Sequence, residues 1–232
     1  MCGRFIQLGM QGLTSDYPDL ELADILPPRP RYNIAPGTKV AALVNQAGHP
    51  KLASLHWGMV PRWAKEESAS IFLANARSES LTTKPAFRHL VEHGRCLIPC
   101  QGFYEWRRDD NGRTKTPYFI QHRRGEMLYL AGLWDTWSTP GGETLHSCTI
   151  ITCPPNQLMQ DIHHRMPVLL PVLHGRMWLD ERYPCRLVSP FMQPFPNGAL
   201  AAHPVSHRVN SPQNDDESLI VPVTPPASLF DL

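Results

Sequence analysis

The sequence predicts a single α+β domain built on a bent, barrel-like, mainly antiparallel β-sheet with short flanking helices. Apolar runs of strand length recur along the 232-residue chain, whereas segments with helical signals are short, and long helices and strands do not alternate. Prolines number 24, about twice the usual fraction. Because proline interrupts helices and central strands, we expect many short elements joined by rigid turns.

The first half of the chain contains two helical signals and one strand pair. Residues 14–26 have the pattern of a short amphipathic helix with Thr14 or Ser15 as its N-cap, and a proline-rich stretch follows. Residues 40–45 and 52–59 are strand-like runs that flank a hairpin turn. Residues 85–93 begin with proline and end before Gly94, which predicts a second helix.

The second half consists mainly of strand-like runs. Strands are expected at 95–106 and 117–121 around the turn sequence Asp-Asp-Asn-Gly, and at 127–137 and 145–152. A third short helix is expected at 156–164. From Val209 the chain is polar and then proline-rich, so we divide it into a domain of residues 1–210 and a C-terminal tail of residues 211–232.

Composition restricts the class of protein. A hydrophobic fraction of 42% excludes a disordered chain, collagen and a coiled coil, and the net charge of +1 gives no global sign of a polyanionic partner. Residues 1–124 carry 17 basic and 11 acidic side chains, however, and arginines outnumber lysines by 17 to 5. The arginine bias favours a local phosphate-binding patch in the first half, although a genome rich in G and C explains it equally well.

The cysteines predict an intracellular protein with reduced thiols, cytoplasmic or nucleoid-associated if bacterial. The six cysteines form no paired Cys-x-x-Cys spacing, and the sequence contains neither a signal-peptide-like N-terminus nor an apolar run of membrane-spanning length. We therefore expect no metal and no cofactor, and we expect a monomer.

Cys2 is the first candidate reactive residue. The small second residue favours removal of Met1, which would leave an N-terminal cysteine with an amine and a thiol two carbons apart. An α-amine with a pKa near 7.7 to 8.0 is partly neutral at pH 7 and forms a Schiff base with an aldehyde, after which the thiol closes onto the imine carbon. The product is a thiazolidine, which an internal cysteine or lysine does not form. The alternative is that a cysteine stands at this position by chance.

Glu105 is the second candidate, within the sequence Gly-Phe-Tyr-Glu-Trp. Strand alternation places Phe103 and Glu105 on one face and Tyr104 and Trp106 on the other. A carboxylate in so apolar a run lies either in water at a strand end or in a pocket. A pocket would raise its pKa and suit it to proton transfer.

Two further segments carry polar residues suited to a site. Asn75 and Arg77 occur in Leu-Ala-Asn-Ala-Arg-Ser-Glu-Ser, and His163 and His164 end the third predicted helix. Helical geometry turns neighbouring side chains about 100° apart, so at most one of the two histidines faces a given pocket. Periodicity does not choose between them, and a structural role is the alternative for either.

Seven segments, in this order, resemble the SOS-response-associated peptidase (SRAP) family, whose members process abasic sites in DNA. The segments are MCGRF at the start, YNIAPG at 32–37, HWGMVPRWA at 56–64, NARSES at 75–80, RCLIPCQGFYEW at 95–106, IHHRMP at 162–167 and the weaker PVSHRVN at 204–210. The resemblance covers nearly the whole chain and makes residues 1–210 the catalytic domain.

The resemblance implies covalent capture, through Cys2, of the ring-opened aldehyde of an abasic site in single-stranded DNA or at a junction where a polymerase has stalled. Closure of the thiazolidine removes an imine that would otherwise promote strand breakage. The family pattern identifies the catalytic set as Cys2, Asn75, Glu105 and His163, with His164 at a variable position. It also implies phosphate contacts by Arg4, Arg77 and Arg165 and a stacking role for Trp63, for which a core aromatic is the alternative.

Two alternatives to this function remain. The family name indicates a thiol peptidase, which in this chain could be restricted to removing Met1. A single-stranded DNA-binding module without chemistry is the second alternative. Separately, the C-terminus is similar to short motifs that dock replication proteins onto sliding clamps, through Ser228, Leu229, Phe230 and Leu232. For that segment the alternative is a tail that folds back on the core.

Overall fold

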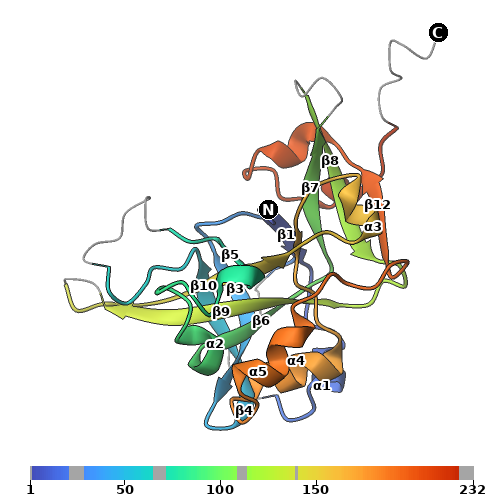
Figure 1. Cartoon of the computed structure of the whole chain (residues 1–232). Coiled ribbons are helices and arrows are strands. Elements are labelled where there is room, and N and C mark those ends of the chain that lie inside the picture. The colour runs from blue at the N-terminus through green and yellow to red at the C-terminus, as the bar shows by residue number, and fades with distance from the viewer. Residues whose placement is uncertain (1, 21–28, 65–71, 109–113, 139–140, 225–232) are drawn as a thin grey trace.

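The computed structural model describes residues 2–20, 29–64, 72–108, 114–138 and 141–224, which form two β-sheets with short helices around them (Figure 1). In the larger sheet, the order β10-β4-β3-β6-β9 closes into a barrel because β10 also pairs with β9. The β10–β4 pair is parallel and the other four pairs are antiparallel. The predicted fold class is therefore confirmed. The barrel strands are β3 (Lys39–Gln46), β4 (His49–Trp57), β6 (Arg95–Cys100), β9 (Leu128–Ser138) and β10 (Thr144–Cys153).

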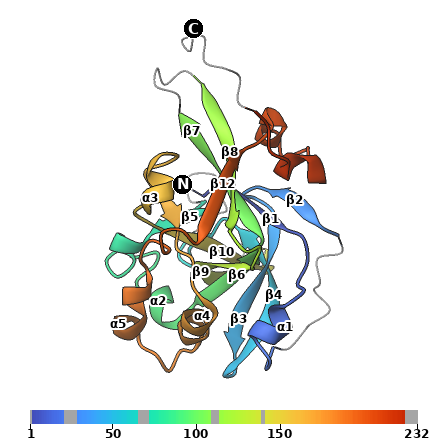
Figure 2. The ribbon, with the colours of Figure 1, turned by 90° about the vertical axis from the view of Figure 1, so that its right-hand side faces the viewer.

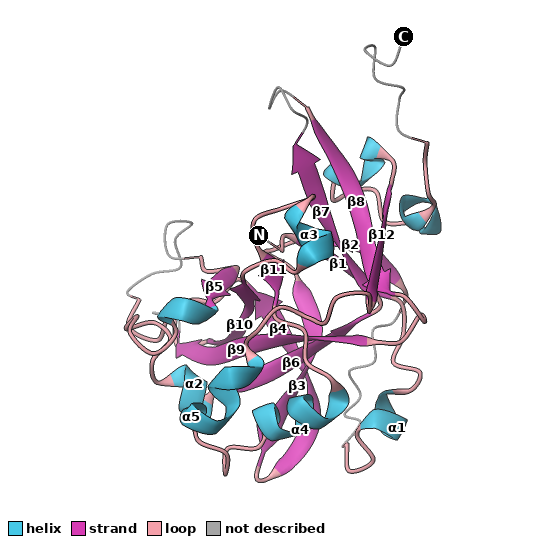
Figure 3. Cartoon of the chain, turned by 45° about the vertical axis from the view of Figure 1, so that its right-hand side comes forward, coloured by secondary structure: helices cyan, strands magenta, loops and turns pink. Residues whose placement is uncertain are grey.

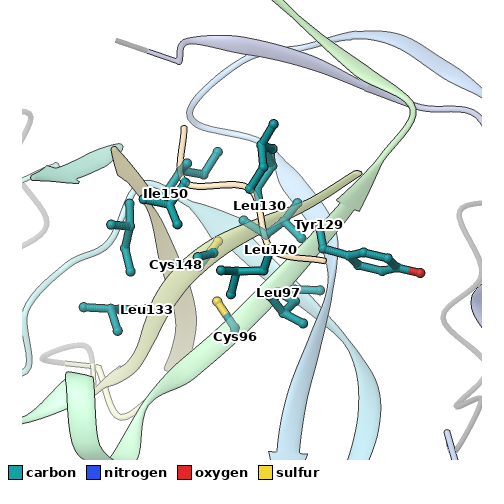
Figure 4. Packing of buried hydrophobic residues seen from close by; sticks show 14 of the residues in the cluster. Cys96, Leu97, Tyr129, Leu130, Leu133, Cys148, Ile150 and Leu170 are labelled. Atoms are coloured by element: carbon teal, nitrogen blue, oxygen red, sulfur yellow. The ribbon is translucent and has the colours of Figure 1, made fainter. Parts of the chain in front are cut away.

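The core of the protein is centred on these strands. Figure 4 shows part of it, including Leu130, Ile150 and Cys148, none of which has solvent-accessible surface. A Cβ atom on Gly132 would lie 2.8 Å from the Cys96 sulfur, so the close packing of β9 against its neighbour requires glycine at this position. Burial of this apolar surface is the main stabilising contribution of the fold.

The second sheet is antiparallel and has the strand order β12-β8-β7-β1-β2. Its β7–β8 hairpin extends away from the barrel, and the N-terminal end of β1 lies between the two sheets (Figures 1 and 2). Buried polar side chains gather where the sheets meet. The strands are β1 (Arg4–Gln7), β2 (Arg31–Ile34), β7 (Gly102–Arg108), β8 (Lys115–His122) and β12 (Leu200–Pro204).

The chain passes from the barrel to the second sheet at Gln101. The prediction of one strand over 95–106 is therefore wrong, because this segment contributes to β6 and β7 in different sheets. The Gln101 side chain bonds the backbone of Leu8 and Gly9, which fixes the corner. A Cβ atom on Gly102 would lie 2.4 Å from the Phe119 ring, so the strand needs glycine where it enters the second sheet.

Short helices cover one end of the barrel, away from the N-terminal end of β1, whereas α3 lies beside the second sheet (Figure 3). The α-helices are α1 (Leu13–Asp16), α2 (Leu90–His93), α3 (Gln157–Gln160), α4 (Val172–Leu179) and α5 (Cys185–Val188). The 3₁₀ turns are η2 (Ser78–Ser80), η3 (Ser189–Phe191), η4 (His207–Asn210) and η5 (Glu217–Ile220). Two short strands, β5 (Asn75–Arg77) and β11 (Met166–Pro167), pair with β10. Within the described ranges, every helix is too short or too polar to cross a bilayer.

The predicted helices form only in part. The first has Gly12 as its N-cap, not Thr14 or Ser15, and it ends at Asp16; residues 21–26 of the prediction lie outside the described ranges. Residues 85–89 instead form turns, in which the amides of Phe87 and Arg88 both donate to the Lys84 carbonyl oxygen, and α2 follows them. The third predicted helix ends at Gln160, so His163 lies in the turn beyond it.

The predicted strands are better matched. The pair at 40–45 and 52–59 is β3–β4, joined by Ala47 and Gly48 with φ of 52° and 90°, which is the two-residue hairpin geometry. The runs at 117–121, 127–137 and 145–152 are β8, β9 and β10. The turn expected at 109–112 lies outside the described residues.

The start of the C-terminal segment packs on the second sheet. Leu219 and Val209 are buried together with Tyr104, on the face of the sheet opposite to Glu105. Asp215 accepts hydrogen bonds from the backbone amides of Tyr32 and Asn33. Residues 225–232, which contain the clamp-like motif, lie outside the described part of the chain.

Candidate active site at the N-terminal end of β1

Cys2 lies directly before β1, where the two sheets meet, and has no solvent-accessible surface. The Asn75 side-chain amide donates a hydrogen bond to its carbonyl oxygen at 3.0 Å. Burial, and then the nearby charge of Glu105, raise the pKa of the Cys2 thiol to about 12. The thiol is therefore protonated at neutral pH.

Glu105 lies on β7 near Cys2, because β7 pairs with β1 in the register Arg4↔Tyr104. The predicted alternation is confirmed, because Phe103 lies in the main core whereas Tyr104 lies in the outer cluster. The Glu105 carboxylate is only 4% exposed and accepts a hydrogen bond from the Trp106 amide at 3.1 Å. Burial raises its pKa above the ordinary value, which is the direction that suits a group exchanging protons.

His163 faces the Glu105 carboxylate from the turn after α3. Its Nδ1 lies 3.8 Å from Glu105 Oε2 and 3.1 Å from both the backbone nitrogen and the backbone oxygen of Arg165. Burial is the main cause that lowers the pKa of His163 to about 4, so the ring is neutral at pH 7. The His164 ring lies against it at 4.3 Å between centroids but is itself exposed.

Asn75 is held at the site by β5, which runs parallel to β10 with Asn75 opposite Ile150. Its Nδ2 donates to the Cys2 carbonyl oxygen, whereas its Oδ1 is buried and has no hydrogen-bond partner among the described residues. A buried acceptor without a partner costs free energy that a ligand donor would recover. The four residues predicted as catalytic are thus brought together from four separate segments of the chain.

The two arginines predicted to bind phosphate at Arg4 and Arg165 are both engaged within the protein. Arg4 donates to the Asn33 side chain at 2.8 Å and to the carbonyl oxygens of Val209 and Asn210. Arg165 is 8% exposed and forms a bidentate ion pair with Glu79. Glu79 lies in the quoted NARSES motif, but sequence reasoning gave it no role, since nothing in the sequence pairs it with Arg165.

Arg77 and Trp63, by contrast, are exposed beside the site. Trp63 is 60% exposed, so the alternative of a core aromatic is wrong. Both residues line an open groove of about 550 Å³ that begins at Asn75. Its lining residues are Pro61, Trp63, Leu73, Asn75, Ala76, Arg77, Lys84, Pro85, Ala86 and Phe87.

Within the ranges that the structure describes, His, Cys, Asp and Glu residues do not gather in any group of three or more with the spacing of a metal site. The six cysteines are all buried as free thiols.

Comparison with known proteins identifies the family. A family model described as SOS response associated peptidase (SRAP) matches residues 1–212. The chain belongs to this family. The resemblance seen in the sequence motifs is therefore confirmed, and it extends over all strands of the barrel and of the second sheet.

Other SRAP relatives match along almost their whole length. The abasic site processing protein YoqW of Bacillus subtilis is 39% identical over 229 residues, which cover 95% of this chain and 99% of that protein. The abasic site processing protein YedK of Escherichia coli is 33% identical, with coverage of 96% and 100%.

Solved structures share the fold of this SRAP chain. A crystal structure of a protein from Bacteroides thetaiotaomicron has a TM-score of 0.76 at 25% identity and covers 83% of this chain and 85% of its own. A phage-related protein from Bordetella bronchiseptica has a TM-score of 0.68 at 30% identity, with coverage of 88% and 94%.

Proposed function

We propose that this SRAP protein senses abasic sites in single-stranded DNA and crosslinks to them through Cys2 after removal of Met1. The observation that carries the proposal is the buried Cys2, whose carbonyl is held by Asn75 beside Glu105 and His163. The relatives named abasic site processing proteins support the choice of substrate.

The reaction combines an aldehyde, an amine and a thiol and releases one water. The Cys2 amine attacks C1′ of the ring-opened sugar to give a carbinolamine, and loss of water from this adduct leaves an imine. The thiol sulfur then adds to the imine carbon while its proton goes to the nitrogen, which closes the five-membered ring. The strand is protected because the thiazolidine lacks the imine that promotes β-elimination.

Each neighbouring side chain is assigned one role in this reaction. Glu105, with its raised pKa, exchanges protons with the amine and the carbinolamine oxygen. His163 assists proton delivery to the sugar oxygen that departs when the sugar ring opens. Asn75 holds the Cys2 backbone, so that the amine and the aldehyde meet in a fixed geometry.

The state of the thiol argues against a general thiol peptidase. A peptidase nucleophile is a thiolate, which forms when a neighbouring imidazole takes its proton. In the chain that still carries Met1, the pKa of Cys2 is raised to about 12 and that of His163 is lowered to about 4, so both shifts oppose such an ion pair. A protonated thiol instead suits a reaction in which the amine attacks first and the thiol second.

We also propose that the groove beside Asn75 receives the DNA strand. Arg77 and Lys84 supply positive charge for phosphates, and the exposed Trp63 ring provides a surface on which a base stacks. To contact DNA, Arg4 and Arg165 would have to bind a phosphate in addition to their present protein partners. Residues 1–210 would perform the chemistry, with 211–232 as an accessory segment.

The test is adduct formation with an abasic oligonucleotide, using protein whose N-terminal mass shows that Met1 is absent. Wild-type protein should give a heat-stable adduct. Cys2→Ala should give none, but because it keeps the α-amine it should give an imine that borohydride traps. Cys185→Ala, which removes another buried thiol, is the matched control and should behave as wild type.

An undiminished heat-stable adduct in Cys2→Ala would contradict the proposal. Equal affinity for normal and abasic strands, without any adduct, would favour a non-catalytic DNA-binding module instead.

A further inference from the structure

The Arg165 side chain connects three parts of the chain around the site. Its Nη2 lies 2.9 Å from Oε2 of Glu79, and its Nη1 donates to the other carboxylate oxygen. The same Nη2 donates to the Thr152 carbonyl oxygen at 2.6 Å. Because Arg165 is 8% exposed, Glu79 supplies the negative charge that balances a guanidinium almost removed from water.

The backbone of Arg165 is in turn the support of the His163 ring. Nδ1 lies 3.1 Å from both the nitrogen and the oxygen of residue 165, and this contact holds it 3.8 Å from Glu105 Oε2. A displacement of residue 165 would therefore move the imidazole away from the Glu105 carboxylate. The other charged or titratable groups that act on the ring are the α-amino group of the chain, His164, on its own turn, and Arg108, on β7.

The carboxylate of this ion pair lies just after the strand that carries Asn75. Glu79 lies in η2, which follows β5 directly, and β5 pairs with β10 so that Arg77 is opposite Thr152. The hydrogen bond with Arg165 is also the main cause that lowers the pKa of Glu79 to about 2, so the carboxylate is charged throughout the physiological range. The pair thus links the segment of Asn75 to the segment of His163.

We infer that Glu79 is a positioning residue. It acts through Arg165 to hold His163 against Glu105 and to fix the segment of Asn75 relative to the segment of His163. Its effect on the reaction rests on the proposed function, whereas its effect on the His163 ring does not. Glu79 itself touches neither Cys2 nor a substrate in this arrangement. Its loss should change the state of the histidine and not only the stability of the fold.

The test is an NMR titration of the His163 ring in the DNA-free protein, with circular dichroism to establish folding. Glu79→Gln leaves the buried guanidinium without its counter-charge, so residue 165 should shift and the ring should become hydrated. The pKa of His163 should then rise from about 4 by about one unit or more toward the ordinary ~6.5. Glu79→Asp, which shortens the carboxylate arm, should give a smaller rise.

The control is Asp180→Asn, which removes a carboxylate from the Asp180–Arg182 pair beyond α4 and should leave the titration unchanged. In the crosslinking assay, Glu79→Gln should lower the rate about ten- to hundred-fold. The loss should be smaller near pH 6 than near pH 8, because a higher pKa leaves more of the His163 ring in the protonated form that delivers a proton.

An unchanged His163 titration in folded Glu79→Gln and Glu79→Asp would overturn this inference, even if their adducts form slowly. A shifted titration in a protein whose wild type forms no adduct would support the positioning role and contradict the proposed function alone.

Discussion

Two buried carboxylates show how this fold separates stability from chemistry. Asp135, on barrel strand β9, is 6% exposed and accepts two hydrogen bonds from Arg62, at 2.8 and 3.2 Å. Glu105, on β7 of the second sheet, is 4% exposed and faces the neutral ring of His163 at 3.8 Å. A guanidinium fork binds the first carboxylate, whereas burial raises the pKa of the second. At a similar depth of burial, the two carboxylates thus face different side chains, a guanidinium in one case and an imidazole in the other.

The largest expected effect is that of Glu105→Gln on the reaction. Removal of the proton-exchanging group should lower the crosslinking rate by about 10²- to 10⁴-fold. Stability at neutral pH should stay equal or increase, because the amide lacks a charge that is costly to bury. Single-turnover adduct formation and urea unfolding measure the two quantities; a normal rate together with a loss of stability would assign Glu105 a structural role.

Asp135→Asn should show the opposite pattern. It breaks the bidentate pair with Arg62, whose side chain is 57% exposed and so returns easily to water. We expect a loss of about 1 to 3 kcal/mol of unfolding free energy, and an unchanged crosslinking rate. A rate that falls together with stability would mean that the barrel rim and the site are coupled.

Arg77→Ala should have a smaller effect, confined to DNA. Arg77 is exposed at the groove and its removal should leave the unfolding free energy within about 0.5 kcal/mol of wild type. Binding to abasic and intact strands should weaken alike, and the slope of log K against log salt should decrease by about 1. A salt slope equal to that of wild type would exclude a phosphate contact by this residue.

The smallest effect concerns the pH dependence of stability. His163 has a folded pKa of about 4, below its ordinary ~6.5, so the unfolded chain binds the proton first and stability decreases as the pH falls from about 6.5 to 4. For Glu105, the raised folded pKa makes stability decrease as the pH rises above about 4.3.

The contributions of His163 and Glu105 to stability oppose each other between about pH 4.3 and 6.5. A variant that removes one residue should therefore reveal the pH dependence contributed by the other. His163→Asn should become more stable relative to wild type as the pH falls, and Glu105→Gln should become more stable relative to wild type as it rises. Urea unfolding at several pH values measures this. Parallel curves for wild type and both variants would show that neither pKa is shifted by folding.

The sequence predicted the strands of the barrel well because their apolar runs are continuous and one tight turn joins β3 to β4. It did not predict that β6 and β7 belong to different sheets, since the break at Gln101 depends on contacts with residues 8 and 9, which are distant in sequence. The helices were predicted too long, because capping and stop signals do not show how soon tertiary contacts replace helical bonds.

The site was predictable in its residues but not in its connections. Cys2 and Glu105 followed from their chemistry and their strand position, and the family motifs added Asn75 and His163. The pairing of Arg165 with Glu79 was not predictable, because these residues are 86 positions apart and meet only through the β5–β10 register. Sequence motifs identify reactive groups, whereas the groups that hold them in place depend on the fold.

Asp215 protects an edge strand of the second sheet from pairing with other molecules. β2 is an edge strand of the five-stranded sheet, and an uncovered edge offers amides to the strands of other chains. Asp215 occupies the amides of Tyr32 and Asn33, while the Asn33 side chain bonds the carbonyls of Val209, Ser211 and Asn214. The C-terminal segment thus blocks strand addition at the edge nearest to β1, and protects the sheet that carries Glu105 from edge-to-edge aggregation.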